Sequence, residues 1–326
     1  MRAIVITKPG GPEVLELREL PSSLPQRGEV RVRVRATAVN RADLLQRMGA
    51  YPAPPDAPAD IPGLEFAGEV DLVGESVTDW KPGDRVFGLA GGGTYAEELI
   101  VHARTLARLP DKLSFTDAAA IPEAFITAYD AMVTQSGLAA GESVLISAVG
   151  SGVGTAAVQI AQAIGARSIG TARTADKLTR AQSLGLDAGV VPDGGRFADA
   201  VQKANFGRGV DVVLELVGGT YVPEDLLCLA PQGRLILVGL LAGIRADLDL
   251  ATILHKRLTV RGTQLRKRPL EEKIAATQSF QRHLVPLFAA GKLKSIVDRV
   301  LPLAAAAEAH AYVASNEGFG KLVLAV

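Results

Sequence analysis

The sequence predicts an α/β protein with two domains, in which a doubly wound parallel sheet is inserted into a β-rich domain. The 326 residues are long for one domain and suit two. The first third contains short alternating segments typical of strands, and from about Ile121 helical and strand-like patterns alternate. Within that second part, an apolar run ends in a glycine-rich turn that opens a helix.

The N-terminal part is predicted to be rich in strands. Arg31, Arg33 and Arg35 alternate with valines, so the valines should face a core and the arginines should face solvent. This run is therefore better explained as a solvated strand face than as a binding patch. Further strands are expected at 65–73, 85–89 and 96–101, separated by turn sequences such as Lys81-Pro82-Gly83-Asp84.

The glycine-rich turn follows a strand-like apolar run that begins at Val144, and a helix from Thr155 to Gly165 comes next. Glycine lets the backbone approach a ligand closely, and a helix start offers unpaired N–H groups and the positive end of its dipole. A dinucleotide pyrophosphate is the usual ligand of such a turn, and a ligand-free structural turn is the alternative. The residues expected to bind it are Gly150, Gly152, Val153 and Gly154.

A second strand is expected at 167–171 and a second helix from Thr174 onward. Enzymes that use NAD usually end this strand with Asp or Glu, which binds the adenine ribose. No carboxylate stands there in this chain. Arg173, Thr174 and Lys177 could bind a ribose phosphate, so the sequence favours NADPH. The alternative is that these side chains are solvated surface groups.

Two continuous apolar runs, 211–216 and 234–238, are predicted as strands buried on both faces. Both end near glycine, and the carboxyl ends of parallel strands line the ligand crevice of an open sheet. The loop residues expected to contact the cofactor are Val217, Gly218, Gly239 and Leu240.

The C-terminal part is expected to return to the first domain. A last strand of the parallel sheet is predicted at 258–261, and the chain from about Gln264 should contain one long helix and a final strand at 321–324. The predicted domains are therefore 1–122 with 264–326, and 123–263.

Composition excludes several classes of function. Lys and Arg together number 35, as do Asp and Glu, so the net charge is zero and nothing attracts nucleic acid or an anionic membrane. No apolar run is long enough to span a membrane and the N-terminus lacks a secretory signal, so we expect a cytoplasmic protein. The single cysteine, Cys228, lies among apolar residues and is expected to be a buried, inert thiol. The four histidines lack metal-ligand spacing.

Several further motifs are spread over almost the whole chain: Met1-Arg2-Ala3-Ile4, Gly10-Gly11-Pro12, Val39-Asn40-Arg41-Ala42-Asp43, Pro62-Gly63-Leu64-Glu65-Phe66-Ala67-Gly68, the run from Ser151 to Ala157, and Gly320-Lys321. Together they resemble the medium-chain dehydrogenase/reductases, and among these the zinc-free quinone oxidoreductases, most closely those of the p53-inducible type. The resemblance implies a GroES-like β-rich catalytic domain with an inserted Rossmann domain. It also implies a homodimer, formed through edge strands near 258–262.

The zinc-containing members of that superfamily carry a cysteine near the position of Asn40 and a Gly-His-Glu motif. This chain has Gly63-Leu64-Glu65, so leucine stands where histidine would bind zinc. A tetrahedral catalytic zinc site cannot be assembled from these residues, and we expect metal-free chemistry. Without a Lewis acid, quinones and activated enones are better substrates than alcohols, because the anion left after hydride arrival is delocalised.

The resemblance also implies three catalytic candidates. Tyr51 matches a tyrosine beside the active site, where its phenol could hydrogen-bond a quinone oxygen or deliver a proton; packing on neighbouring prolines is the alternative. Ser151 would face the nicotinamide, or else cap the helix. Asn40 would orient cofactor or substrate, or else fasten a turn.

Three more residues complete the expected cofactor contacts. Thr127 matches a family position beside the nicotinamide, with a helix-start cap as the alternative. Leu265 and Lys321 are the other two. The nearby run Arg266-Lys267-Arg268 is expected to be a solvated turn, with a contact to the phosphate of NADPH as the alternative.

The function expected from these features is an NADPH-dependent, zinc-independent quinone oxidoreductase. An enone or alkenal double-bond reductase and a non-catalytic NADPH-binding protein are the alternatives. The expected partner is a small-molecule quinone or enone, and RNA binding is disfavoured by the neutral charge.

Overall fold

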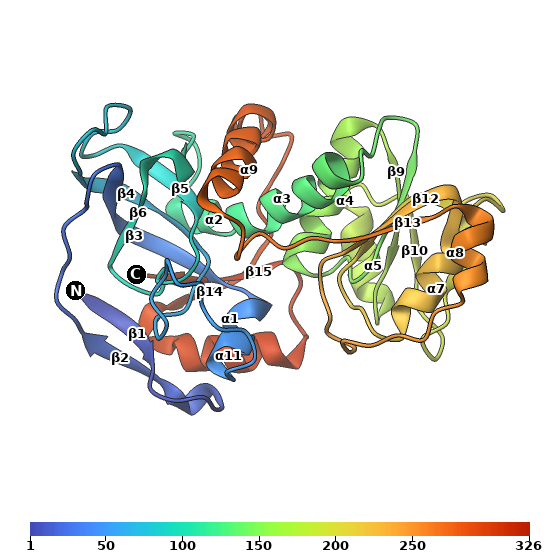
Figure 1. Ribbon diagram of the computed structural model, residues 1–326, viewed down its shortest axis with the longest axis horizontal. Helices are drawn as coiled ribbons and strands as arrows, with labels where there is room; N and C mark the ends of the chain where they lie inside the picture. Colours follow the sequence, from blue (N-terminus) through green and yellow to red (C-terminus); the bar gives the residue numbers. More distant parts are fainter. The chain divides into compact units, whose positions relative to one another are not determined.

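The computed structural model describes all 326 residues, which form two compact units (Figure 1). Unit 1 comprises Met1–Ile126 and Leu265–Val326, and unit 2 comprises Thr127–Gln264. The sequence predicts boundaries after residues 122 and 263, whereas the units divide after Ile126 and after Gln264. No helix combines the length and the apolar character that a membrane span requires.

Unit 1 is built on a seven-stranded sheet with the order β14-β15-β3-β4-β5-β7, in which β6 also pairs with β3. Only the β14–β15 pairing is parallel. Its strands are β3 (Glu29–Val39), β4 (Glu65–Val73), β5 (Arg85–Leu89), β6 (Glu98–His102), β7 (Leu106–Arg108), β14 (Val297–Pro302) and β15 (Lys321–Ala325). A separate antiparallel pair consists of β1 (Arg2–Ile6) and β2 (Leu15–Glu19).

Unit 1 has two longer helices, α9 (Leu270–His283) and α11 (Ala306–Ser315), and its other helices are short. The short ones are α1 (Arg41–Arg47), α2 (Phe115–Ala119) and α10 (Val285–Ala289). Helix α3 (Pro122–Tyr129) begins in unit 1 and continues past the boundary into unit 2.

Strand β3 confirms the predicted alternation. Its valines are buried and its arginines lie on the opposite face. Arg31 and Arg33 both pair with Asp71 of β4, and Arg35 pairs with Glu69 of the same strand. The arginine run is thus an ion-paired outer face of the sheet, and it is not a cluster of unbalanced positive charge.

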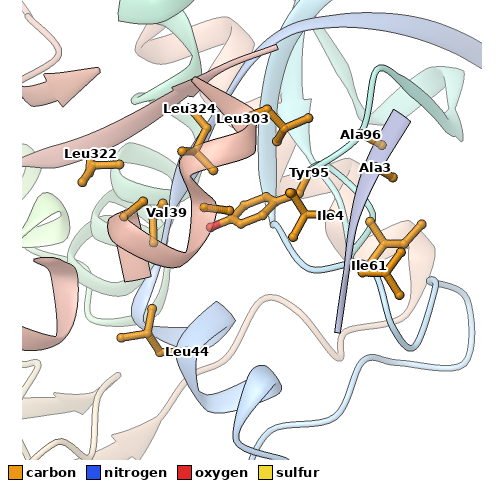
Figure 2. Close-up of a cluster of buried hydrophobic side chains, with 13 residues drawn as sticks. Ala3, Ile4, Val39, Leu44, Ile61, Tyr95, Ala96, Leu303, Leu322 and Leu324 are labelled. Carbon is orange, nitrogen blue, oxygen red and sulfur yellow. The ribbon is translucent and has the colours of Figure 1, made fainter. Parts of the chain in front are cut away.

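The core of unit 1 surrounds the fully buried ring of Tyr95. In Figure 2 the ring lies among apolar side chains from both ends of the chain, including Ile4 and Leu324, and its hydroxyl points away from Ile4. A buried hydroxyl needs a hydrogen-bond partner. Asp43 and His310 supply it, each at 3.2 Å.

Unit 2 contains a six-stranded parallel sheet, whose order β10-β9-β8-β11-β12-β13 is the 3-2-1-4-5-6 order of a doubly wound dinucleotide-binding fold. Its strands are β8 (Ser143–Ile146), β9 (Arg167–Thr171), β10 (Ala188–Val190), β11 (Val210–Glu215), β12 (Leu229–Leu237) and β13 (Thr259–Gly262). Helices α4 (Gly152–Ile164), α5 (Ala175–Gln182), α6 (Ala198–Ala204), α7 (Tyr221–Cys228) and α8 (Leu250–Lys256) pack around the sheet (Figure 1), and the segment Asp130–Gln135 forms a π-helical turn. The predicted fold class is confirmed.

The structure also contains elements that the sequence does not predict. In the N-terminal part these are the short strands β1, β2 and β7. In the C-terminal part, where the sequence predicts one long helix and one strand, the structure also has β14 and α11. Strand β12 begins at Leu229, well before the predicted run at Arg234. The turn-like sequence Pro231-Gln232-Gly233 hides this extension, because Gln232 has a positive φ of 64° and the strand bulges there.

Candidate functional site

The start of α4 forms a backbone cradle for an anion. Ser151 is the N-cap, and its Oγ accepts the N–H of Gly154 at 3.0 Å. The N–H groups of Gly152 and Val153 donate to no acceptor in the protein, so both are available at the positive end of the helix dipole. The structure thus shows Ser151 in its alternative role, as the cap of the helix. The hydroxyl accepts in this bond, so its hydrogen can still be donated to another group.

Gly154 has a steric reason to be glycine. A Cβ at this position would lie 2.6 Å from the Cα of Val149, because the helix starts directly against the turn. Any side chain would push the helix away from β8. The close approach therefore holds the start of the helix directly against the turn.

The end of β9 carries cations and no carboxylate. Thr171 is buried, Arg173 and Thr174 are exposed, and Lys177 lies in the first turn of α5. Thr174 occupies the N-cap position of α5, but its side chain makes no capping bond. The arrangement fits a ribose phosphate, because two cations and a hydroxyl gather near one strand end.

The loops after β11 and β12 lie together at the carboxyl edge of the same sheet. The N–H of Ala242 donates to the carbonyl oxygen of Val217 at 2.8 Å. A Cβ at Gly239 would lie 2.7 Å from the carbonyl carbon of Leu216, and one at Gly218 would lie 2.8 Å from the carbonyl oxygen of Gly239. The structure thus brings Val217, Gly218, Gly239 and Leu240 to the edge where the glycine turn also lies.

A buried carboxyl pair behind these loops was missed by the sequence analysis. Glu215 and Asp225 are both fully buried. One oxygen of Glu215 accepts the N–H groups of Val217 and Gly218, which fixes the loop. Neither oxygen of Asp225 receives a donor from the protein, and its carboxyl lies close to that of Glu215. Burial first, and then the charge of Glu215, raise the pKa of Asp225 well above its ordinary value.

In unit 1, Asn40 and Lys321 meet around Glu65. Asn40 donates to Glu65 Oε1 at 2.9 Å, and Lys321 Nζ lies 2.6 Å from the same oxygen. Lys321 also donates to Asn40 Oδ1 and to the carbonyl oxygen of Val39. Because all three ammonium hydrogens are engaged, the structure places Lys321 in this cluster and leaves it no donor for a cofactor.

The three residues come from neighbouring strands of one sheet. Asn40 directly follows β3 and caps α1 together with Asp43, Glu65 begins β4, and Lys321 begins β15. Glu65 is fully buried and Lys321 is 6% exposed, so each charge depends on the other for its compensation. Leu64, beside Glu65, is also buried. No group of three His, Cys, Asp or Glu side chains in the chain is arranged to hold a metal ion.

A cavity in unit 1 lies next to this cluster. Its apolar lining is formed by Leu64, Leu89, Ala90, Leu265 and Ala276. Glu123, Arg266 and Lys273 are its charged or ionisable lining residues. Leu265, expected at the cofactor, is therefore placed by the structure on this cavity.

The expectation that Arg266 lies in a solvated turn is wrong, because its side chain is buried. It is 6% exposed and donates to the carbonyl oxygens of Gly91 at 2.7 Å and Tyr51 at 3.2 Å, and to the side chain of Gln46. The ring of Tyr51 lies 5.1 Å from the Arg266 guanidinium and 5.4 Å from the Lys267 ammonium. Tyr51 is thus in a cationic setting, which favours a partial negative charge nearby.

The structure excludes the alternative role of Thr127 and confirms the burial of Cys228. Thr127 lies near the end of α3, so a helix-start cap is wrong for it. Cys228 is buried as predicted, and burial raises the pKa of its thiol. Among the histidines, His310 is buried against Tyr95, and burial lowers its pKa to about 3, so it stays neutral.

Comparisons with known proteins give the family. Residues 26–111 match the model of the alcohol dehydrogenase GroES-like domain, and residues 152–281 match that of zinc-binding dehydrogenases. The chain is 33% identical to human quinone oxidoreductase over 330 residues, which covers 99% of this chain and 97% of the relative. The chain belongs to the quinone oxidoreductases of the medium-chain dehydrogenase/reductase superfamily. It is an oxidoreductase, and the family expected from the sequence is confirmed.

Solved structures of this superfamily match along the whole chain. The Escherichia coli quinone oxidoreductase, solved with NADPH, is 30% identical with a TM-score of 0.89 and 100% coverage of both chains. A structure described as an NAD-dependent alcohol dehydrogenase is 35% identical with a TM-score of 0.88, again with 100% coverage of both. Relatives with either nicotinamide cofactor therefore share this fold.

Proposed function

We propose that this oxidoreductase transfers hydride from NADPH to a quinone without a catalytic zinc ion. The observation that carries the proposal is the donor set around Glu65. Leu64 offers no metal ligand, Asn40 is a poor one, and the Glu65 carboxylate is neutralised by Lys321. The names of the full-length relatives support the quinone as acceptor.

The dinucleotide site of unit 2 fits NADPH. When bound, NADPH supplies the hydride. The N–H groups of Gly152 and Val153 would hold the pyrophosphate, Arg173 and Lys177 would bind the ribose phosphate, and the loops after β11 and β12 would complete the site. The complex of the Escherichia coli relative with NADPH supports this assignment.

The acceptor would be oriented by residues of unit 1. The phenol of Tyr51, beside two cations, is suited to hydrogen-bond the acceptor oxygen as negative charge develops on it. Asn40 acts through Glu65 and Lys321, and we propose that it positions this cluster. Ser151 and Thr127 remain proposed contacts to the nicotinamide.

The assay that tests this function is quinone-dependent oxidation of NADPH by protein dialysed against a chelator. We expect turnover with a simple quinone and no loss of rate after dialysis. Loss of activity that zinc restores would contradict the metal-free chemistry. An enone or alkenal is the second candidate acceptor, because the cavity lined by Leu64 and Leu265 is mostly apolar, as is the carbon skeleton of such a substrate.

A further inference from the structure

Glu123 is the one carboxyl group that lines the cavity of unit 1. It lies in the first turn of α3, and its backbone N–H donates to Glu65 Oε2 at 2.8 Å, which fixes the start of the helix. Its own carboxyl receives no hydrogen bond from the protein. The side chain is only partly exposed, and most of the cavity around it is apolar. Such surroundings disfavour a charged carboxylate.

The charged groups around Glu123 come from three elements of unit 1 and from the turn that contains Arg266. Burial has the largest effect on its pKa, followed by the Glu65 carboxylate of β4; Asp43 of α1 acts in the same direction. Lys321 of β15 and Arg266 oppose them. The net result raises the pKa of Glu123 to about 8.

A further cation on the cavity wall does not alter this balance. Lys273 of α9 lines the cavity, but its ammonium pairs with Asp56 at 3.0 Å. The donors of Lys321 and Arg266 are likewise directed to other partners. Near neutral pH, Glu123 is therefore a carboxylic acid to which no group of the protein donates a hydrogen bond, and it lines a mostly apolar cavity.

We propose that Glu123 donates a hydrogen bond to the oxygen of an acceptor bound in this cavity, and gives up its proton when that acceptor is reduced. This inference rests on the proposed function. Reduction of a quinone to a hydroquinone requires a hydride and a proton. The hydride carries both electrons, and NADPH becomes NADP⁺. The O–H bond of Glu123 breaks as an O–H bond forms on the acceptor, and the resulting carboxylate regains a proton from water.

The first test is the pH dependence of duroquinone reduction by wild-type protein, Glu123→Gln and the control Glu308→Gln. Glutamine keeps the shape and cannot ionise, and Glu308 is an exposed residue of α11 in the same unit. We expect wild-type kcat/KM to fall above about pH 8, and Glu123→Gln to lose about tenfold or more near pH 7 and to lack this alkaline decline. Glu308→Gln should behave as wild type. An alkaline decline that persists in Glu123→Gln overturns the proposal.

The second test needs no turnover. Infrared difference spectra without cofactor should show a carboxylic acid C=O band in wild type that is absent from Glu123→Gln, and duroquinone should shift this band to lower frequency. Duroquinone has no free ring position, so it does not alkylate the thiol of Cys228. Equal circular dichroism spectra and equal thermal unfolding of variant and wild type verify that Glu123→Gln is folded.

The infrared result distinguishes failure of the proposed role of Glu123 from failure of the proposed quinone reductase function. A missing band, or a band that saturating duroquinone does not shift, overturns the role of Glu123 even if quinones are turned over. A shifted band in a protein that oxidises no NADPH supports the hydrogen bond to Glu123 and contradicts the proposed function.

Discussion

Buried ionisable residues in both units are stabilised in two different ways. Lys321 and Glu65 are both charged, and Asn40 satisfies further hydrogen bonds of the pair. Asp225 has no cation beside it, and burial and the nearby charge of Glu215 raise its pKa, which favours the protonated form. The first arrangement compensates the loss of hydration by an ion pair, and the second avoids one of the charges.

The protonated pair gives a prediction for Asp225→Asn. The unfolded carboxyl ionises above its ordinary pKa of 3.8, whereas the folded one keeps its proton, so the free energy of unfolding falls as the pH rises. Asparagine removes this loss, and its amide can donate to Glu215 Oε2, which has no donor. We expect a gain of about 1–2 kcal/mol near neutral pH.

Thermal unfolding measured between about pH 5 and pH 8 checks this prediction. The stability difference between Asp225→Asn and wild type should widen as the pH rises. A difference that is constant over this range would contradict a raised pKa of Asp225 in the folded protein.

At the scale of elements, the segment β8–α4–β9 explains most of what sequence reasoning could predict. Its signals are local: an apolar run, a glycine turn, a helix closed by Gly165 in the left-handed region, and a second strand. The structure reproduces each of them. Strand β14 and the extension of β12 lack such local signals, because one has no clean alternation and the other contains a proline and a bulge.

The candidate site was less predictable, because its residues meet only through the sheet order. Asn40, Glu65 and Lys321 come together because β15, β3 and β4 are neighbours, which no spacing along the chain reveals. Arg266 lies in a charged run that looks solvated. Glu123 was missed because an acidic residue in a first helical turn usually only complements the dipole.

The end of β9 gives a prediction about cofactor choice. Arg173→Asp restores the acidic residue that NAD enzymes usually carry and removes one phosphate ligand. We expect the KM for NADPH to rise about tenfold or more, while the KM for NADH changes little or falls. Arg208→Asp, an exposed change elsewhere in unit 2, is the matched control. Equal effects of Arg173→Asp on both cofactors would remove Arg173 from the phosphate site.

At the scale of the whole molecule, the edge strand β13 supports the proposed homodimer. All four of its residues are exposed, and an exposed edge is a template for pairing with a second chain. We expect light scattering to give twice the mass of the 34.1 kDa chain, and Val260→Lys to give the mass of one chain. A monomeric wild-type protein would contradict this proposal. The cytoplasmic location and the lack of nucleic-acid binding stay predictions.

The central claim is that this fold transfers hydride from NADPH to a quinone. It is tested most directly by the rate of cofactor oxidation with duroquinone, measured in parallel with NADPH and NADH on chelator-treated protein. We expect quinone-dependent oxidation with a higher kcat/KM for NADPH than for NADH. Preference for NADH would contradict the assignment of Arg173 and Lys177, and absence of oxidation with either cofactor would contradict the function itself.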